Sequence, residues 1–361
     1  MLVSSSVGSP RAHRSGRLKI GVYGAGAIGG YLGLRLGARA EVTLVGRPWL
    51  ANRAAELCAV DLEGQRHENP VRVTTDAAEL AQVDVCLVTV KGRDTAEAGS
   101  ALARVLRPSA LVVSFQNGLR NAERLRAALP AQVVAPGMVT FNVVVESERC
   151  FRQTTSGPLC AGRVLGSGLG TLERLEAVFG GVGLPLTLSS DIGNLQAGKL
   201  LLNLNNGICA ATGLSIQASL LSRPARRAFS ACILEGHEVL VRSGRRPARV
   251  MALPPTAIAR LLTLPDAVFV RAARPLFTAH PSAKSSTLQD LERGRVTEID
   301  ELSGEIVRLA DEAGLSAPAN TEVCRAVTAL TRRAARAPLT PEDYLTPEAL
   351  LERIQRQRHR E

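Results

Sequence analysis

Lysine is rare in this sequence, so the few lysines present are the first candidates for chemistry that needs a titratable cation. The 361 residues include 44 basic ones, of which only Lys19, Lys91, Lys199 and Lys284 are lysines, the rest being arginines. Arginine stays protonated at physiological pH and cannot replace lysine where a proton must be given up. Lys91 and Lys199 also lie in sequence contexts that suggest a site.

Lys199, Asn203 and Asn206 form a polar stripe in the otherwise apolar run 196–209. Their i, i+4, i+7 spacing places them on one face of a predicted helix. Burying such groups without partners costs several kcal/mol, so we expect the stripe to face a site. A lysine held partly out of water has a lowered pKa and can donate a proton near neutral pH. The alternative is a lysine that reaches solvent beside asparagines bonded to neighbouring backbone.

A glycine-rich turn follows the first apolar run, 19–24, and precedes a predicted helix. Gly24, Gly26 and Gly29 occupy the three positions of G-x-G-x-x-G, which makes a tight turn, lets a pyrophosphate approach and packs helix on strand. A second apolar run at 41–46 completes a βαβ unit, which strengthens the prediction of a dinucleotide site. The expected cofactor-binding residues of the turn are Gly24, Ala25, Gly26, Ala27, Ile28 and Gly29.

The residues after the second predicted strand favour NADP(H) over NAD(H). A carboxylate at this position accepts a hydrogen bond from the ribose 2′-hydroxyl of NAD, whereas this sequence has Gly46-Arg47. Arg47, with Arg53 nearby, offers a planar donor group to a 2′-phosphate. The alternative is a solvated loop arginine.

Further predicted strands at 83–90 and 110–115 flank a helical stretch at 94–106. Lys91 follows the first of these strands and Asn117 the second, at the sheet edge where ligands of such folds collect. We expect both to meet nicotinamide and substrate, although Asn117-Gly118 also fits an ordinary turn.

The sequence divides into a disordered basic leader (1–18), an NADP-binding Rossmann-type α/β domain (19–190), an all-α substrate domain (191–338) and a C-terminal tail (339–361). The leader also has the composition of a transit peptide. Part of the net charge of +11 lies in the tails, and aromatic residues make up only 3%, so we expect no nucleic-acid partner. No membrane segment is predicted.

Seven cysteines without a C-x-x-C motif predict neither a metal site nor a disulfide framework. We therefore expect a reducing compartment, the cytoplasm. In the helical half, Ser286 and Gln289 fit a helix capping box, and the spacing around Glu298 favours a surface acid over a buried one.

Taken in order, six segments resemble the ketopantoate reductase (2-dehydropantoate 2-reductase) family over roughly residues 18–335: GAGAIGG, Val-Lys91, Gln-Asn117-Gly, KLLLNLNNG, SSTLQD and GRVTEID. The resemblance implies NADPH-dependent reduction of 2-dehydropantoate to D-pantoate for pantothenate biosynthesis. It also implies a helical domain like that of the 6-phosphogluconate dehydrogenases.

By resemblance, Lys199 is the general acid and Glu298 the acid that supports it and binds substrate and cofactor. Asn203, Asn206 and Ser286 would bind substrate, Lys91 and Asn117 both substrate and nicotinamide, and Arg47 the 2′-phosphate. Ala197 and Gly207 depart from the usual pattern, so a reductase of another branched or aromatic 2-oxo acid stays open, as does a non-catalytic NADPH-binding regulator. The small anionic 2-oxo acid is the expected partner, and a homodimer is left open.

Overall fold

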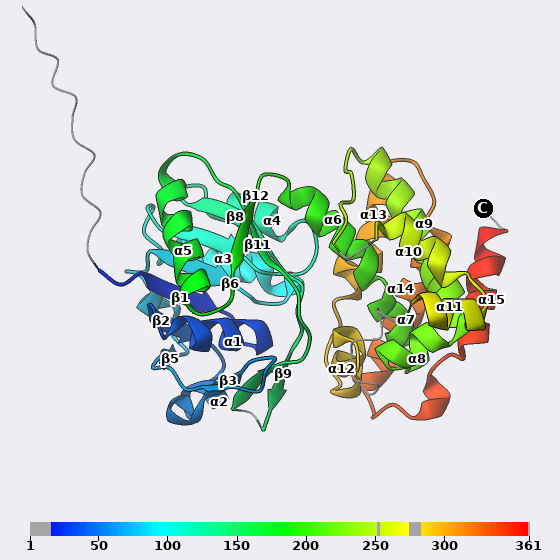
Figure 1. Ribbon diagram of the computed structural model, residues 1–361, viewed down its shortest axis with the longest axis horizontal. Helices are drawn as coiled ribbons and strands as arrows, with labels where there is room; N and C mark the ends of the chain where they lie inside the picture. The colour runs from blue at the N-terminus through cyan, green and yellow to red at the C-terminus, as the bar shows by residue number, and fades with distance from the viewer. Residues whose placement is uncertain (1–15, 148, 251–252, 274–282, 360–361) are drawn as a thin grey trace, which may run out of the picture.

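The structure, a computed structural model, describes residues 16–147, 149–250, 253–273 and 283–359. An α/β domain is followed along the chain by a helical domain (Figure 1). Most of the predicted leader, residues 1–15, lies outside the described residues. Of its last residues, Leu18 is already buried in the core of the α/β domain.

The main sheet of the α/β domain has eight strands in the order β12-β11-β8-β7-β6-β1-β2-β5. The strands from β8 to β5 are parallel to their neighbours, β11 runs antiparallel to β8, and β12 is parallel to β11. The strands are β1 (Lys19–Tyr23), β2 (Glu41–Val45), β5 (Arg72–Thr74), β6 (Val85–Val88), β7 (Leu111–Ser114), β8 (Val133–Val139), β11 (Leu159–Gly162) and β12 (Leu186–Ser189). The four residues of β6 and of β7 are all buried, because helices cover both faces of a parallel sheet.

The helices of the α/β domain follow the alternation that the sequence predicts. They are α1 (Ala27–Leu36), α2 (Pro48–Ala51), α3 (Thr95–Ala103), α4 (Asn121–Ala128) and α5 (Leu169–Gly181), with 3₁₀ turns η1 (Ala54–Glu56), η2 (Ala77–Leu80), η3 (Gly92–Asp94) and η4 (Gly166–Gly168). The predicted fold class, a Rossmann-type domain joined to a helical domain, is confirmed.

A second, four-stranded sheet is a feature that the sequence did not indicate. It has the order β4-β3-β10-β9, formed by β3 (Cys58–Val60), β4 (Arg66–His67), β9 (Val143–Glu146) and β10 (Cys150–Gln153). Phe151 of β10 is fully buried and packs against Gly30 of α1. The small sheet is thus fixed to the helix that follows the glycine turn.

The expectation of no disulfide is wrong for one pair of cysteines. Cys58 and Cys150 are directly opposite each other in the parallel strands β3 and β10, with 4.7 Å between their Cα atoms, and their sulfurs are bonded. Two cysteines in register on adjacent strands are within bridging distance, whatever their separation in sequence. The other five cysteines are free, and Cys86 and Cys209 are buried in the core.

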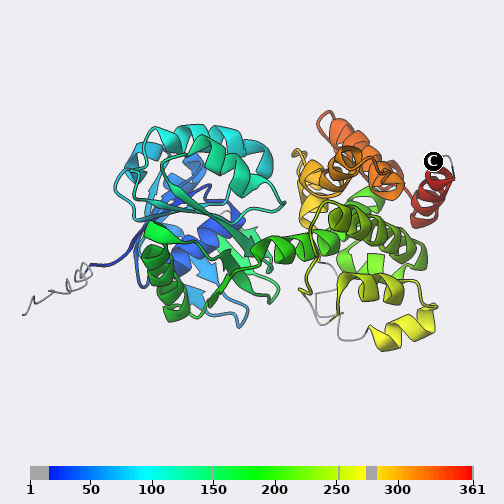
Figure 2. The same cartoon turned by 90° about the horizontal axis from the view of Figure 1, so that it is seen from above.

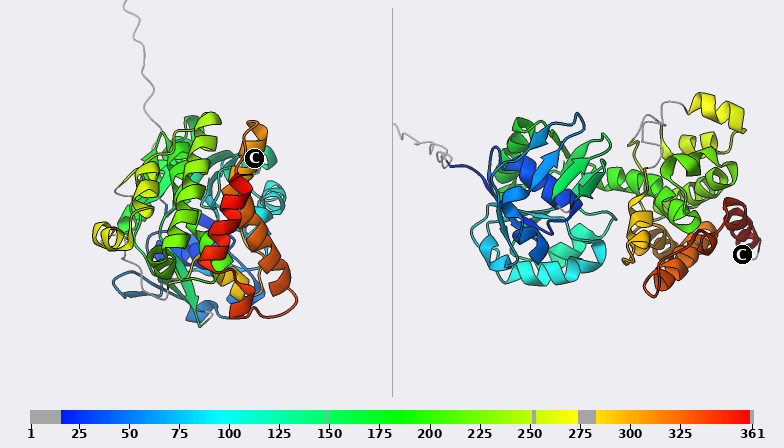
Figure 3. Two further views of the ribbon diagram at one scale, coloured as in Figure 1. Left: turned by 90° about the vertical axis from the view of Figure 1, so that its right-hand side faces the viewer. Right: turned by 90° about the horizontal axis from the view of Figure 1, so that it is seen from below.

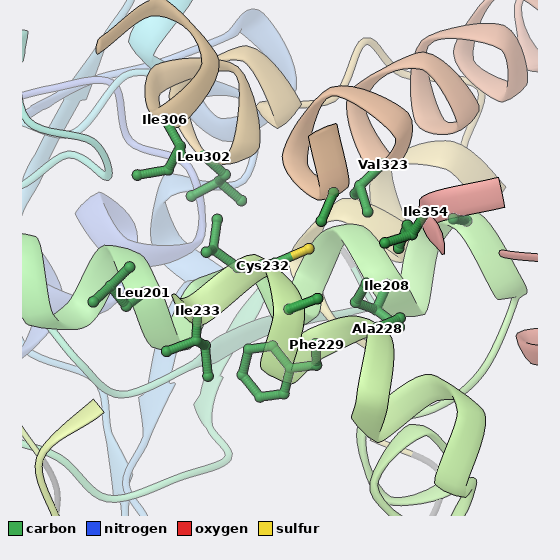
Figure 4. Packing of buried hydrophobic residues seen from close by; sticks show 14 of the residues in the cluster. Leu201, Ile208, Ala228, Phe229, Cys232, Ile233, Leu302, Ile306, Val323 and Ile354 are labelled. Atoms are coloured by element: carbon green, nitrogen blue, oxygen red, sulfur yellow. The ribbon is translucent and has the colours of Figure 1, made fainter. Parts of the chain in front are cut away.

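The helical domain is built on one large apolar core. Its helices are α6 (Ile192–Asn203), α7 (Asn205–Thr212), α8 (Ile216–Leu221), α9 (Arg223–Arg242), α10 (Pro255–Leu262), α11 (Asp266–Ala272), α12 (Ser286–Glu292), α13 (Ser303–Glu312), α14 (Pro318–Ala334) and α15 (Pro347–Arg358), with 3₁₀ turns η6 (Ile299–Glu301) and η7 (Pro341–Asp343). Figure 4 shows aliphatic side chains from α6, α7, α9, α13, α14 and α15 meeting around Cys232. With few aromatic residues, the core is mainly aliphatic.

The segment set apart as a C-terminal tail contains α15. Leu350 and Ile354 of α15 are buried in the same core as α9 and α14, and the helix lies beside α14 in Figure 3. Because these two aliphatic side chains are buried in that core, α15 is part of the helical domain.

Helix α6 connects the two domains (Figure 2). It follows β12 of the main sheet and contacts β8 and β11 on one side and α9 on the other. Lys199, in the middle of α6, therefore lies where the domains meet. In the described part of the chain, no helix is both long and apolar enough to cross a membrane.

Candidate active site

The turn between β1 and α1 has the geometry of a dinucleotide site. Gly24 has φ +99°, and a Cβ there would lie 2.7 Å from the backbone nitrogen of Val90. A Cβ on Gly29 would lie 2.6 Å from the Gly24 carbonyl oxygen, so this glycine allows helix and strand to pack. At Gly26 a Cβ would meet only the Gly24 oxygen, at 3.9 Å, which leaves its outer side open to a ligand.

Gly26 is also the N-cap of α1, so the free backbone N–H groups of Ala27 and Ile28 lie beside this open position. Helix N-termini of this kind bind phosphate groups, because unpaired N–H donors and the helix dipole both favour an anion. The residues present therefore fit the pyrophosphate of a dinucleotide.

Arg47 directly follows β2, and its side chain is exposed at the N-cap of α2. This is the edge of the sheet at which the adenosine ribose of a dinucleotide lies in such folds. An exposed guanidinium at that edge fits a 2′-phosphate. Arg53, six residues on, is partly exposed and engaged in contacts of its own.

Lys199 of the helical domain is held by two groups of the α/β domain. Its ammonium donates to Asn117 Oδ1 at 2.9 Å and to the backbone oxygen of Val139 at the end of β8. Burial lowers the pKa of Lys199 to about 8, against the opposing attraction of the Glu298 carboxylate. The contact with the Asn117 side chain brings together two residues that the sequence indicated separately, and the lowered pKa allows the lysine to release its proton near neutral pH.

Glu298 lies in the interior, so the sequence-based preference for a surface acid is wrong. It precedes the turn η6 instead of lying on a regular helix, and its side chain is only 12% exposed. One carboxylate oxygen accepts from the backbone N–H of Gly92 at 3.1 Å, and the other lies 3.5 Å from the Lys91 ammonium. The acid acts on Lys199 through electrostatic attraction.

Lys91 lies between two carboxylates of the helical domain. Its ammonium donates to Asp290 of α12 at 2.6 Å and approaches Glu298. Burial alone would lower the pKa of Lys91, but Glu298 and Asp290 together raise it above its ordinary value. Lys91 therefore stays charged, and its role in this arrangement is that of a fixed cation, in contrast to Lys199.

A narrow pocket opens beside Lys199 at the junction of the domains. Asn117 and Gly118 of the β7–α4 loop, Lys199 and Asn203 of α6 line it together with Leu302. The remaining lining residues are Gln116, Gly137, Met138, Gln196 and Leu200. Its volume of about 10 Å³ is at the lower limit for a single water molecule, so the pocket in this arrangement does not hold a substrate.

The predicted stripe is interrupted after Asn203. Helix α6 ends there and α7 begins at Asn205, so Asn206 lies beyond a junction and outside the pocket lining. The Asn206 carbonyl oxygen accepts from Ser285 Oγ at 3.3 Å, which ties α7 to α12. The backbone of Asn206 thus contacts α12, whereas Asn203 lines the pocket.

Ser286 is exposed at the first position of α12 and is not the helix cap. The cap is Ser285, whose Oγ accepts from the backbone N–H of Leu288 at 3.2 Å. Gln289 donates to the Lys284 carbonyl oxygen, so the expected capping box at 286–289 is absent and the side chain of Ser285 caps the helix. Lys284 itself pairs with Glu292 on the surface.

Sequence reasoning missed several residues of this junction. Gln196 donates to the Gly137 carbonyl at 2.9 Å, and Asp290 pairs with Lys91. Asp290 is the last residue of the SSTLQD segment, and its place in that segment could have indicated that it belongs to the site. Within the described ranges, no three His, Cys, Asp or Glu side chains gather as a metal site would require.

The glycine turn at the sheet edge and the buried lysine at the domain junction define a two-domain oxidoreductase that uses a nicotinamide dinucleotide. Two family models match, "Ketopantoate reductase PanE/ApbA" over residues 20–166 and "Ketopantoate reductase PanE/ApbA C terminal" over residues 191–331. The chain therefore belongs to the ketopantoate reductase family.

Individual proteins agree with this assignment. A 2-dehydropantoate 2-reductase of Halobacterium salinarum is 29% identical over 331 residues, which is 88% of this chain and 99% of the relative. A crystal structure of a PanE/ApbA family ketopantoate reductase from Ralstonia eutropha JMP134 superposes with a TM-score of 0.73 at 30% identity, covering 88% of this chain and 100% of that one.

A further structure shares the fold at lower identity. The ternary structure of D-mandelate dehydrogenase with NADH and anilino(oxo)acetate has a TM-score of 0.72 at 18% identity and covers 88% of this chain and 100% of that one. The same two-domain architecture thus occurs in a protein named for a different 2-hydroxy acid.

Proposed function

We propose that this protein reduces 2-dehydropantoate (ketopantoate) to D-pantoate with NADPH, a step of pantothenate and coenzyme A biosynthesis. The observation that carries the proposal is Lys199, a lysine with a pKa lowered to about 8 at the junction of the two domains. The family membership and the 2-dehydropantoate 2-reductase relative support the choice of substrate.

When bound, the nicotinamide supplies the hydride that reduces the ketone. Lys199 donates a proton to the carbonyl oxygen as negative charge develops there. Asn117 and the Val139 carbonyl hold the ammonium in place, and the Glu298 carboxylate favours its protonated form. A protonated lysine with a pKa near 8 is a stronger acid than an ordinary lysine, which suits it to this step.

The substrate is an anion, and the residues proposed to bind it are polar or cationic. Asn203 lies on the pocket side of α6, one turn after Lys199. Ser286 is exposed at the start of α12, and Lys91 is on the loop that faces α12. Separation of the domains would admit the substrate, and closure would exclude water from the reacting groups.

NADPH is the proposed cofactor because Arg47 stands at the ribose edge without an acidic neighbour at position 46. Trp49, the single tryptophan of the sequence, lies two residues further on in α2. Energy transfer from Trp49 to bound NADPH or NADH therefore measures the affinity for each cofactor directly.

A reductase of another branched or aromatic 2-oxo acid is the second candidate. The pocket is lined on its apolar side by Met138, Leu200 and Leu302, which do not select for a hydroxyl group. The D-mandelate dehydrogenase neighbour shows that the fold accommodates such a reaction elsewhere. The reacting residues of this chain would be the same.

A panel of 2-oxo acids at fixed NADPH concentration tests both candidates. We expect the highest kcat/KM with 2-dehydropantoate, and Lys199→Ala should lose most of that activity while still binding NADPH. A higher value for a different 2-oxo acid replaces the substrate assignment. NADPH binding without turnover of any 2-oxo acid would instead indicate a regulator. A homodimer is part of the same proposal, and light scattering of the purified protein tests it.

A further inference from the structure

Two arginines of the α/β domain cross the domain junction to two buried glutamates of the helical domain. Arg124 Nη1 donates to Glu301 Oε1 at 2.7 Å, and Arg120 Nε lies 2.8 Å from Glu305 Oε2. We refer to Arg120, Arg124, Glu301 and Glu305 as the interdomain latch. Arg120 is the N-cap of α4 and Arg124 lies in its first turn, directly after the loop that carries Asn117.

The carboxylates of the latch are removed from water, so they depend on their partners. The Glu305 side chain is fully buried and that of Glu301 is 10% exposed. Glu305 is also bound by Arg308 of its own helix, at 2.7 Å. Breaking a buried ion pair by removing one partner is strongly unfavourable, because it leaves a charge uncompensated. Moving the domains apart would remove one arginine from each glutamate.

Glu301 fits between the two loops that carry Lys91 and Asn117. A Cβ on Gly92 would lie 2.7 Å from Glu301 Cγ, and a Cβ on Gly118 would lie 3.0 Å from Glu301 Oε2. Glycine at both positions thus gives the carboxylate room to enter. Its Oε2 atom is buried and has no hydrogen-bond partner among the described residues. The negative charge of the carboxylate is therefore compensated by the Arg124 guanidinium, which donates to Oε1.

A chain of hydrogen bonds connects Glu301 to the proton donor. Arg124 Nη1 also donates to Asn121 Oδ1 at 3.1 Å, and Asn121 Nδ2 donates to the backbone oxygen of Asn117. Asn117 Oδ1 in turn accepts from Lys199. The orientation of the group that holds the lysine is thereby coupled to the closed arrangement of the domains.

We propose that the interdomain latch closes the cleft and sets the position of Asn117 against Lys199, with Glu301 as its central positioning residue. The proposal rests on the proposed function, because it assigns Lys199 as the proton donor. It goes beyond that function by naming residues that lie outside the pocket lining and yet control the geometry of the reacting lysine.

Glu301→Gln tests the latch, with Glu322→Gln as the matched control. Glu322 is also buried, with a side chain 6% exposed, and pairs with Arg325 at 2.7 Å, but both partners belong to the helical domain. We expect Glu301→Gln to lower kcat/KM by roughly tenfold or more and to move the pH at which Lys199 loses its proton. Glu322→Gln should lower the melting temperature at least as much without changing either kinetic quantity.

Arg124→Gln and the double variant show whether the pair acts as one unit. Loss of either partner should have the same kinetic effect, and the double variant should be no slower than Glu301→Gln. Arg124 is 30% exposed, so its replacement leaves a folded protein to measure if Glu301→Gln does not fold. Unchanged kinetics in Arg124→Gln, or purely additive losses in the double variant, would overturn the latch.

Small-angle X-ray scattering of the full chain provides a readout without any substrate. We expect a larger radius of gyration for Arg124→Gln than for the wild type or Glu322→Gln, because the cleft opens. If the wild type reduces no 2-oxo acid but this difference is present, the proposed function fails and the closing role of the latch holds. An unchanged radius of gyration contradicts the latch, whatever the activity.

Discussion

The lowered pKa of Lys199 predicts how reduction depends on pH. Lys199 must be protonated to donate, and with a pKa of about 8 roughly nine tenths of it is protonated at pH 7 but only about one tenth at pH 9. The kcat/KM for the 2-oxo acid should therefore fall about tenfold per pH unit above pH 8. A lysine at its ordinary value of 10.5 would keep the rate constant to about pH 10.

Glu298→Gln tests the cause of this pKa. The Glu298 carboxylate raises the pKa of Lys199 against the effect of burial, so its removal should move the inflection below pH 8. Lys199→Arg should abolish the inflection and lower the rate by about 10²- to 10⁴-fold, because a guanidinium does not release its proton. Glu322→Gln, which lies away from the junction, serves as the control with an unchanged inflection.

The assay is NADPH oxidation followed by absorbance between pH 6 and about pH 10, with cofactor saturating at each pH. Trp49 energy transfer confirms saturation independently of turnover. A wild-type profile without an inflection between about pH 7 and pH 9 would refute Lys199 as a proton donor of lowered pKa. The same inflection in wild type and Glu298→Gln would refute the electrostatic role of Glu298.

Three further predictions concern the cofactor and the α/β domain. Arg47→Ser should weaken NADPH binding by roughly tenfold or more and leave NADH binding nearly unchanged, as measured by tryptophan energy transfer; equal losses for both cofactors would contradict the 2′-phosphate role. Gly26→Ala should fold normally but bind the dinucleotide poorly, whereas Gly29→Ala should lower the melting temperature, because its Cβ would meet backbone; the opposite order would exclude the assigned glycine roles. Reduction of the Cys58–Cys150 bond, which joins residues 92 positions apart, should lower the free energy of unfolding by up to about 4 kcal/mol in denaturant titrations, and a Cys150→Ser variant should not respond to the reductant.

The α/β part of the fold was predictable because its signals are local. The glycines at 24, 26 and 29 and the short apolar runs that become β1, β2, β6 and β7 are each readable within a few residues. The pairing in the small sheet has no such local signal, since β4 has two residues and β3 pairs with β10, which comes much later in the sequence. The same long-range pairing brings Cys58 to Cys150, which cysteine spacing alone does not reveal.

The site was predictable in its residue types and less so in its contacts. Lys199 and Asn117 could be selected separately, from a polar stripe and from a strand end, and the structure brings them within hydrogen-bond distance. The burial of Glu298 could not be predicted from the local residue pattern, because its partners Lys91 and Gly92 belong to the other domain; only the family resemblance placed it in the site. Charges that are satisfied across a domain boundary look like surface charges in the sequence of either domain.

The hydrogen bond from Lys199 to the Val139 carbonyl oxygen matters for any attempt to change the substrate range by mutation. A main-chain oxygen is present whatever side chain stands at position 139, so one of the two hydrogen bonds that hold Lys199, the proposed proton donor, does not depend on the residue type there. The neighbouring pocket residues Met138 and Leu302 can then be varied in a library for new 2-oxo acids while the donor stays in place. If the proposed reaction is correct, proton donation and substrate choice can be altered by separate substitutions in the same pocket wall.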